Sequence, residues 1–331
     1  MKATHRLIPL SERDEWRDAL LGIRHAFAHT WEHCYAMHLT TGLETFLYRF
    51  ENDGMQMVCP VAEREFSGYT DIVKPFGISG FAGNGSCPGF STYWKEFASD
   101  RGYVCGYLGL HPVFDHGHLF DPSEIFRYNT VYIMDLTPPE DQILAKMSAT
   151  RREQINRGDG AETTLVHDKS LLATFFLEHY EGFLRSRGAP PHYFFSQQTL
   201  SYLLSCDNVM LVGAQKSGKI IAANLFAYTN DIGDGLFNVS LPEGRSSSAT
   251  LLWQAARKLK SLGVPAKNLG GGKSNSGIAK FKQRFGCKEL PLRCLKQIYR
   301  PDVYRELCAQ TNTDPDDMNG FFPAYRQKKP G

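Results

Sequence analysis

The chain has 331 residues, of which 42% are hydrophobic and 12% aromatic, and its formal net charge is +2. This length and apolar content provide for two domains with cores of their own, which excludes a small disulfide-stapled protein and an intrinsically disordered one. The near-neutral charge averages two unlike parts: residues 1–140 carry 11 Lys and Arg against 18 Asp and Glu, and residues 141–331 carry 26 against 17.

The compartment follows from what the sequence lacks. The N-terminal residues MKATHRLIPL contain no apolar core of a signal peptide. No later run approaches the roughly 18 apolar residues of a membrane span. The eight cysteines are scattered without a C-x-x-C pair, which favours reduced thiols over a disulfide framework or a zinc site. We therefore expect a cytoplasmic protein.

In the first part of the chain, Ser11 to Asp14 read as a capping box that opens a helix, and the Asp53-Gly54 pair predicts a hairpin turn. The glycine-rich stretch 66–89 has no helical period and is interpreted as a loop. The other elements expected here are a helix at Thr30–Leu39 and strands at Glu44–Phe50, Met55–Glu63, Tyr103–Leu110 and Thr130–Leu136.

Thr137-Pro138-Pro139-Glu140 combines a cap, helix-start prolines and a capping-box acid, so one long helix is predicted from there to about Arg157. The charge balance changes sign at this point. We place the domain boundary here, with domains at 1–139 and 140–300 and with 301–331 packing back on the first. The later elements expected are strands at 162–167, 208–214, 219–228, 236–241, 266–269 and 290–299, and helices at 169–187, 196–205, 248–262, 277–285 and 301–310.

These elements predict the fold class. Two helices, an antiparallel meander and a strand–helix–strand–helix–strand tail describe a mixed α/β protein with helices packed on sheets.

The most distinctive charge feature lies at 257–300, where Glu289 alone opposes twelve basic residues, so that the net charge is +11 over 44 residues. Such a segment attracts polyphosphates and nucleic-acid backbones. The alternative is a solvated face without a partner. The basic residues are Arg257, Lys258, Lys260, Lys267, Lys273, Lys280, Lys282, Arg284, Lys288, Arg293, Lys296 and Arg300.

Two further segments could bind phosphate. Residues 269–277 do not have the spacing of a Walker loop, because the position of that motif's first glycine is taken by Lys267. Their glycines can still let a substrate approach the main chain, or can simply form a tight turn. Arg245, Ser246 and Ser247 precede a predicted helix, which suits an anion, although a serine N-cap alone explains them equally well.

Other candidate chemistry is weaker. His25, His29 and His33 are spaced as on one helical face, but we expect no metal there because the spacing crosses a helix break expected at Thr30 and no carboxylate or thiol spacing supports a site. Residues 150–157 offer a second basic helical face. Local motifs indicate no covalent nucleophile and no carboxylate pair.

Taken in order, several segments resemble those of Fem-type aminoacyltransferases within the GNAT acyltransferase superfamily. They span roughly residues 25–300. The segments are the glycine loop Asp71–Phe81, the strand Thr130–Leu136, the helix Ser148–Arg157 with its R-x-x-I-x-R pattern, Arg187, Tyr193-Phe194-Phe195, Leu269–Gly272, Phe281-Lys282 and Phe285-Gly286.

The resemblance implies two tandem GNAT-like domains, each with a mixed sheet flanked by helices. It also implies amide formation by attack of an amine on an activated acyl group. The donor is aminoacyl-tRNA in Fem-type enzymes and acyl-CoA in ordinary GNAT enzymes. No resident cofactor or metal is expected, and the acceptor is a small-molecule or peptide amine, such as a natural-product or cell-wall precursor.

Lys282 matches the family's lysine near the donor, and we assign it to the catalytic set with Asn238 and Tyr193. Arg245 is followed by serines instead of the glycines typical of an acyl-CoA loop, which favours aminoacyl-tRNA. The donor-binding set is Lys280, Arg284, Arg245, Ser246, Ser247, Gly270, Gly271, Gly272 and Lys273. The acceptor-binding set is Phe76, Gly77, Gly80, Arg151 and Asn224.

Two alternatives stay open at this point. An acyl-CoA-dependent N-acyltransferase would use Arg245 and the following helix start for the pyrophosphate. A non-catalytic RNA-binding protein would keep the fold and the basic segment without the chemistry.

Overall fold

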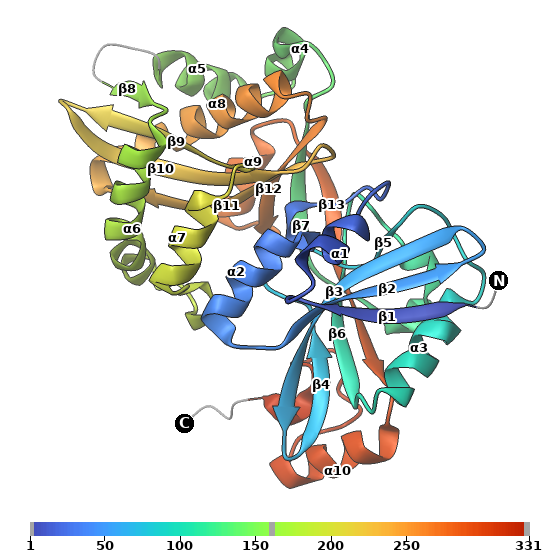
Figure 1. The fold of residues 1–331 in the computed structure, drawn as a ribbon. Coiled ribbons are helices and arrows are strands. Elements are labelled where there is room, and N and C mark those ends of the chain that lie inside the picture. The colour runs from blue at the N-terminus through green and yellow to red at the C-terminus, as the bar shows by residue number, and fades with distance from the viewer. Residues whose placement is uncertain (1–2, 159–162, 328–331) are drawn as a thin grey trace. The chain divides into compact units, whose positions relative to one another are not determined.

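The computed structural model describes residues 3–158 and 163–327, and the chain forms two compact units (Figure 1). Unit 1 comprises Met1–Tyr128 and Pro291–Gly331, and unit 2 comprises Asn129–Leu290. These bounds differ from the expected 1–139 and 140–300. The difference arises from two long strands. The strand Ile125–Asp135, expected in the first domain, lies mainly in unit 2, and the strand Lys288–Ile298, expected in the second domain, lies mainly in unit 1.

Unit 1 contains a mixed sheet with the strand order β1-β2-β3-β4-β6-β13, and β5 pairs with β3. Only the β4–β6 pair is parallel among the pairs described in this unit. The strands are β1 (Thr4–Pro9), β2 (Thr45–Asn52), β3 (Met55–Phe66), β4 (Tyr69–Val73), β5 (Ala82–Gly83), β6 (Cys105–Leu110) and β13 (Lys288–Ile298).

The helices of unit 1 pack against this sheet and its connections. They are α1 (Arg13–Asp18), α2 (Trp31–Thr41), α3 (Phe90–Asp100) and α10 (Pro301–Thr311), with 3-10 turns η1 (Phe27–His29), η2 (Gly117–Leu119), η3 (Pro122–Glu124) and η6 (Ala324–Arg326).

The sequence predicted part of this unit. The hairpin is confirmed, because Asp53 and Gly54 both have positive φ, at 47° and 81°, between β2 and β3. The capping-box prediction is wrong, since α1 is capped by Glu12 without a side-chain hydrogen bond. The stretch 66–89 is also not all loop, because β4 and β5 lie within it. Helix α3 was not expected at all.

An aromatic cluster forms the core of unit 1. Tyr48, Phe81, Phe90 and Trp94 are fully buried, and the rings of Tyr48 and Trp94 lie 4.7 Å apart edge to face. The indole Nε1 of Trp94 donates to Oε1 of Gln297 at 2.9 Å, so the buried polar edge of the ring is satisfied. This bond fixes α3 to β13.

A buried carboxylate holds the end of the chain to unit 1. Asp71 on β4 is 1% exposed and forms ion pairs with Arg64 and Arg326, each at 2.6 Å. The Tyr325 hydroxyl donates to the same carboxylate at 2.8 Å. Charge-assisted hydrogen bonds therefore attach Tyr325 and Arg326 of η6 to strand β4.

Within unit 2, the strands form a mixed sheet in the order β7-β12-β11-β10-β9-β8. Its strands are β7 (Ile125–Asp135), β8 (Thr163–Val166), β9 (Val209–Lys216), β10 (Lys219–Tyr228), β11 (Gly233–Ser240) and β12 (Ala266–Gly272). Its helices are α4 (Glu140–Ala145), α5 (Ala149–Gly158), α6 (Lys169–Ser186), α7 (Gln197–Ser205), α8 (Ser248–Ser261) and α9 (Gly277–Gln283), with 3-10 turns η4 (Pro191–Tyr193) and η5 (Pro242–Ser247).

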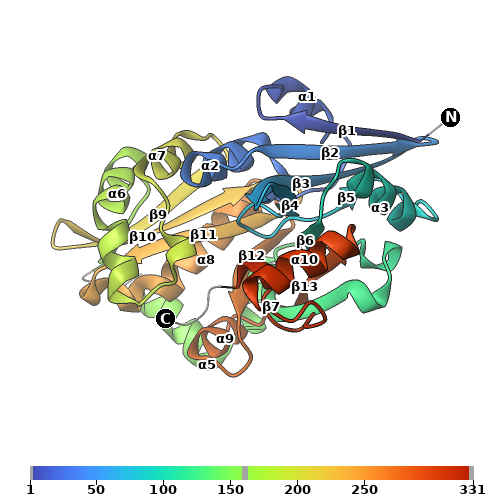
Figure 2. The ribbon, with the colours of Figure 1, turned by 90° about the horizontal axis from the view of Figure 1, so that it is seen from below.

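Helices cover both faces of this sheet (Figure 2). A Cβ on Gly213 of β9 would meet Leu172 of α6, whereas its neighbour Val212 belongs to a cluster with Leu251 and Ala255 of α8. Because side chains alternate along a strand, α6 and α8 must pack on opposite faces. Helix α9 shares a core cluster with α8 and lies on the α8 face.

The long helix predicted from residue 140 to about Arg157 is wrong, since α4 and α5 are separate. Met147 between them turns into the core and is 2% exposed, and the Ser148 N–H donates to the Arg284 carbonyl at 3.0 Å. Burial of Met147 outweighs the local helix preference. The predicted mixed α/β class, with helices flanking the sheet in each unit, is confirmed.

The glycine loop 76–80 of unit 1 is tied down by buried side chains. Nε2 of His33 donates to the Phe76 carbonyl at 2.6 Å, and Nε2 of His29 donates to the Gly80 carbonyl at 3.1 Å. Nζ of Lys74 donates to Gly77 at 2.7 Å. A carbonyl only accepts, so each imidazole carries its hydrogen on Nε2. Nδ1 of His29 lies 3.2 Å from both the N–H and the carbonyl oxygen of Ala26, and in the neutral ring it accepts the N–H.

Burial keeps these histidines neutral. It lowers the pKa of His29 to about 3 and that of His33 to about 4. The unfolded chain takes up a proton near the ordinary histidine value of ~6.5, while the folded chain does not. Each buried histidine therefore stabilises the fold at neutral pH and loses this effect as the pH falls below ~6.5.

Lowering the pH from 7 to 5 is expected to reduce the free energy of unfolding of the wild-type protein. In His29→Gln this reduction is expected to be smaller by about 2 kcal/mol. This magnitude corresponds to ~1.5 pH units below the unfolded pKa at ~1.4 kcal/mol per unit. Urea titrations at the two pH values provide the measurement. His167→Gln, at an exposed position, is the control that should keep the wild-type reduction. Equal reductions in wild type and His29→Gln would contradict the assignment.

Candidate functional site

The parallel strands β11 and β12 pair over only the first part of their length. Gly233 lies opposite Lys267 and Asp234 opposite Asn268, and the described residues show no further pair between these strands. Beyond this point β11 stays paired with β10, and β12 with β7. A strand edge of this kind can hydrogen-bond an extended ligand in the manner of an added strand.

A buried hydrogen bond between two side chains lies at the last paired position of β11 and β12. Nδ2 of Asn268 donates to Oδ1 of Asp234 at 3.0 Å, and Oδ1 of Asn268 accepts the Gly270 N–H at 2.7 Å. The register of β12 against β7 then shifts between Asn268 and Gly271, as in a β-bulge. Gly270 has φ +79°, a conformation that strains other residues. Asn268 therefore fixes the point where the two strands separate.

Lys282 reaches the bulge from α9. Its Nζ donates to the Gly271 carbonyl at 2.7 Å and lies 3.3 Å from the position that a Cβ on Gly270 would take. Burial lowers the pKa of Lys282 to about 8, so the ammonium form still prevails at pH 7. The structure thus brings together the predicted catalytic lysine and two of the predicted donor-binding glycines. The third, Gly272, is the last residue of β12.

Asn238 and Asn224 are directly opposite each other on β11 and β10. Asn224 is also opposite Val212, whose side chain packs toward α8, so both asparagines are on the α8 face. Asn238 is exposed and Asn224 is 7% exposed. The sequence placed these residues in different sets, and the sheet register makes them neighbours.

The turn η5 leads into α8 and carries three of the predicted donor-binding residues. Arg245 and Ser246 are exposed, while Ser247 is buried. Ser247 occupies the N-cap position of α8 without a side-chain capping bond, and Ser248 Oγ donates to the Arg245 carbonyl at 3.0 Å. The positive end of a 14-residue helix with an adjacent arginine suits an anion.

The basic segment 257–300 does not form a single surface. Arg293, Lys296 and Arg300 belong to unit 1. Lys267 is fully buried and donates to the Leu252 carbonyl at 2.7 Å, and burial lowers its pKa. Lys260 Nζ donates to two carbonyls that follow β7, each at 2.7 Å. Of the basic residues of this segment that lie in unit 2, the exposed ones are Arg257, Lys258, Lys273, Lys280, Arg284 and Lys288.

Arg151 is a packing residue in this structure. It is 1% exposed, and its guanidinium donates to the Phe281 carbonyl at 2.9 Å and to Gln154 at 2.8 Å. The same group lies 4.2 and 4.3 Å from the ring centroids of Phe281 and Phe285. Burial and the nearby Arg284 lower its pKa to about 10. Arg151 thereby joins α5 to α9.

The predicted acceptor-binding set is divided between the units. Phe76, Gly77 and Gly80 belong to unit 1, where their carbonyls accept the buried hydrogen bonds described above, and Arg151 and Asn224 belong to unit 2. A Cβ on Gly80 would lie 2.2 Å from the Gly109 carbonyl oxygen, so close backbone packing explains this glycine.

Tyr193 lies in η4 and is 39% exposed. Its carbonyl accepts the Tyr180 hydroxyl at 2.6 Å. Next to it, the ring of Phe195 lies 5.1 Å from Phe237, a residue of β11 beyond its last pair with β12. Sequence reasoning missed Tyr180 and Phe237, because their spacing indicates only ordinary core positions.

The described residues contain no group of three His, Cys, Asp or Glu side chains that could hold a metal ion. All eight cysteines are free thiols, and only Cys287 among them is more than slightly exposed. None of the helices in residues 3–158 and 163–327 is both long and apolar enough to cross a membrane.

No protein-family model matches the chain, and no curated protein matches it by sequence. Solved structures do share its fold. The crystal structure of FemX superposes with a TM-score of 0.69 at 11% identity, covering 92% of this chain and 99% of that one. L-PGS from Bacillus licheniformis gives a TM-score of 0.57 at 15% identity, covering 86% and 91%.

A third solved structure is the C-terminal domain of a putative lysylphosphatidylglycerol synthetase from Agrobacterium fabrum. It gives a TM-score of 0.53 at 17% identity and covers 72% of this chain and 80% of that one. At such identities the likeness concerns the fold. The chain therefore shares the fold of FemX, as the resemblance predicted, and it has two units that each contain a mixed sheet flanked by helices.

Arg151→Met is expected to lower the free energy of unfolding by roughly 3 kcal/mol, because two buried hydrogen bonds and two cation–π contacts are lost. Chemical denaturation measures this change. Arg284→Met, at an exposed position near the Arg151 charge, is the control and should change stability by less than ~0.5 kcal/mol. Similar effects of the two substitutions would show that the packing of Arg151 contributes little.

Proposed function

We propose that the protein is an acyltransferase that forms an amide by moving an aminoacyl group from aminoacyl-tRNA to an amino group of a small-molecule or peptide acceptor. The observation that supports this most directly is the separation of β11 from β12 beside the ammonium group of Lys282. The Fem-type fold is consistent with the proposal.

The separated strands suit an acyl group that lies in extended conformation. The edges of β11 and β12 face such a group with backbone donors and acceptors. The glycine at position 270 leaves room for the Lys282 ammonium group, whose Nζ lies 3.3 Å from the place that a Cβ would take. The acyl carbonyl then lies near a preorganised cation in a partly dehydrated environment, where a charge has its largest effect.

The chemistry needs no covalent enzyme intermediate. The acceptor amine attacks the carbonyl carbon of the aminoacyl ester, and a C–N bond forms while the carbonyl oxygen gains negative charge. Lys282 stabilises that oxygen in its ammonium form. The C–O bond to the ribose then breaks, the amine loses a proton, and the tRNA hydroxyl gains one. Positioning supplies much of the rate, because the ester is already activated.

Exposed basic side chains of unit 2 are proposed to bind the donor's phosphates. Lys280 and Arg284 lie on and just after α9, next to Lys282, and Lys273 follows β12. Asn238 and Asn224 are proposed to orient the reacting groups on the α8 face, and Tyr193 to assist from the α6 face. Aminoacyl-tRNA as co-substrate makes the cytoplasm the proposed place of action, without a further cofactor.

Acyl-CoA is a second candidate donor. The observation that favours it is the start of α8, where Arg245 and the uncapped Ser247 could bind a pyrophosphate. A protein that binds RNA without chemistry is the third possibility, and it would use the same exposed basic residues.

Incubation of the protein with mixed aminoacyl-tRNAs and a panel of amines is expected to give an amide product by mass spectrometry, whereas acyl-CoA donors give none. Binding of tRNA should weaken steeply with added salt, since it rests on phosphate contacts. Product from acyl-CoA alone would assign the second donor. Salt-sensitive RNA binding without any product would overturn the enzymatic proposal.

Lys282→Ala is expected to lower the single-turnover rate at saturating donor by roughly 10²–10³-fold, as for loss of one oxyanion donor. The wild-type rate should fall as the pH rises through about 8, because the lowered pKa of Lys282 removes its charge there. Lys282→Arg should move that decline to higher pH, since arginine stays charged.

Lys280→Ala is the matched control on the same helix. It is expected to raise the KM for the donor while leaving the decline near pH 8 in place. A decline near pH 8 that stays in place in Lys282→Arg would show that the charge of Lys282 does not cause it, and an unchanged Lys282→Ala rate would remove Lys282 from the chemistry.

A further inference from the structure

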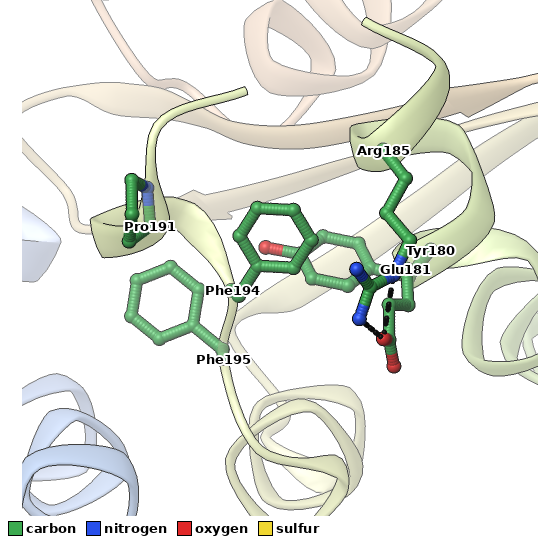
Figure 3. Close-up of a pocket in the computed structure, with 6 residues that line it drawn as sticks. All are labelled: Tyr180, Glu181, Arg185, Pro191, Phe194 and Phe195. Carbon is green, nitrogen blue, oxygen red and sulfur yellow. Dashed lines mark hydrogen bonds and ion pairs between the residues drawn. The ribbon is translucent and has the colours of Figure 1, made fainter. Parts of the chain in front are cut away.

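A pocket of about 310 Å³ opens on the α6 side of unit 2, away from the α8 face on which Lys282 and the asparagines lie. Figure 3 shows its lining residues. They are Tyr180, Glu181 and Arg185 from α6 and Pro191, Phe194 and Phe195 from η4 and the segment that follows it. Three of these six residues are aromatic. The proposed transfer chemistry does not use the pocket.

The walls of the pocket are held in place by the protein itself. The Tyr180 hydroxyl donates to the Tyr193 carbonyl at 2.6 Å, which ties η4 to α6. Tyr180 is 2% exposed, and its ring packs 5.4 Å from that of Phe176. Burial raises the pKa of Tyr180, so its hydroxyl keeps the hydrogen that it donates. A ligand therefore meets a surface that is already ordered.

The pocket is connected to the strand that borders the separation. The rings of Tyr180 and Phe195 lie 5.5 and 5.1 Å from the ring of Phe237 on β11. Phe237 is adjacent in sequence to Asn238, and side chains alternate along a strand, so the two point to opposite faces of the sheet. A group bound in the pocket thus lies against the α6 face of β11, while Asn238 lies on the α8 face.

An ion pair between Arg185 and Glu181 lies at the rim of the pocket. Arg185 forms two hydrogen bonds to the Oε1 atom of Glu181, from Nε at 2.9 Å and from Nη2 at 2.5 Å. Its guanidinium lies 5.6 Å from the centre of the Phe194 ring, where it takes the position that a cationic ligand would prefer. The ion pair adds no net charge. Flat aromatic walls around a neutral rim favour an uncharged ring.

We propose that this pocket, which we call the ring pocket, binds an uncharged aromatic ring of the acceptor, so that the acceptor is an amine that carries an aromatic ring. The inference rests on the proposed acyl transfer, since it assigns the acceptor's chemical class. It also places the acceptor's ring on the face of the sheet opposite to the residues proposed for the donor.

The test compares three amides of the same backbone, phenylalaninamide, alaninamide and argininamide, by calorimetry on the full chain. Phenylalaninamide is expected to bind at least ~10-fold more tightly than the other two. Phe194→Ala and Phe195→Ala should reduce this preference to less than ~3-fold. Phe183→Ala, also on α6 but outside the pocket, is the matched control that should preserve it.

Two further measurements test the proposal even if the alanine variants do not fold. Phe194→Leu keeps an apolar side chain and should still lose most of the ring preference. In the unaltered protein, saturation-transfer NMR should show stronger transfer to the ring protons of phenylalaninamide than to its amide end. Equal binding of the three amides by the unaltered protein, or a preference that persists in both alanine variants, overturns the ring pocket.

The outcomes separate this inference from the function on which it rests. Ring-selective binding that disappears in Phe194→Ala, without an amide product from any donor, overturns the proposed transfer and leaves a ring-binding site. Amide formation with equal kcat/KM for phenylalaninamide and alaninamide overturns the ring pocket and leaves the transfer. A preference for argininamide would assign the pocket to a cation and overturn the proposal.

Discussion

The geometry of unit 2 depends on one buried contact, the hydrogen bond from Asn268 to Asp234 at the last paired position of β11 and β12. Up to this point the strands form a sheet, and beyond it their pairing ends. The same Asn268 holds the Gly270 N–H, so one side chain both closes the sheet and starts the bulge. Lys282 can reach Gly271 because the bulge turns that carbonyl toward α9.

In the proposed reaction, each face of the sheet has a separate task. The α8 face carries the lysine, the asparagines and a helix start suited to anions, while the α6 face carries aromatic side chains. A transferase must hold two different substrates at once and bring only their reacting atoms together. A sheet whose central strands separate provides a natural divider, because each substrate can be recognised on its own face.

Much of the fold could be predicted from the sequence because local signals agree with the tertiary structure. The strands and helices from β8 to α10 lie close to their expected ranges, and the Asp53-Gly54 turn follows from the φ values that a hairpin requires. The failures have tertiary causes. Met147 interrupts a helix to reach the core, and Asp71 lies on a strand within a stretch that glycines made look like loop.

The candidate site, too, could be predicted only where local sequence signals or the resemblance pointed to its residues. Lys282 and the 270–272 glycines could be grouped from the resemblance, and their contact is present. Charge alone was a poor guide, because a run of basic residues says nothing about burial: Lys267 lies inside the protein, and Arg151 is enclosed by two phenylalanines. Phe237 and Tyr180 could not be selected, since an aromatic residue that lines a pocket has the same spacing as one that fills a core.

The chain path has a consequence for synthesis of the protein. Unit 1 is made of two separate segments, and its sheet needs β13, whose residues follow all of unit 2. The ribosome therefore delivers a complete unit 2, at 129–290, before unit 1 has its last strand or the η6 residues that bind Asp71. The half that begins first must finish folding last, with the edge of β6 unpaired in the meantime and open to wrong partners.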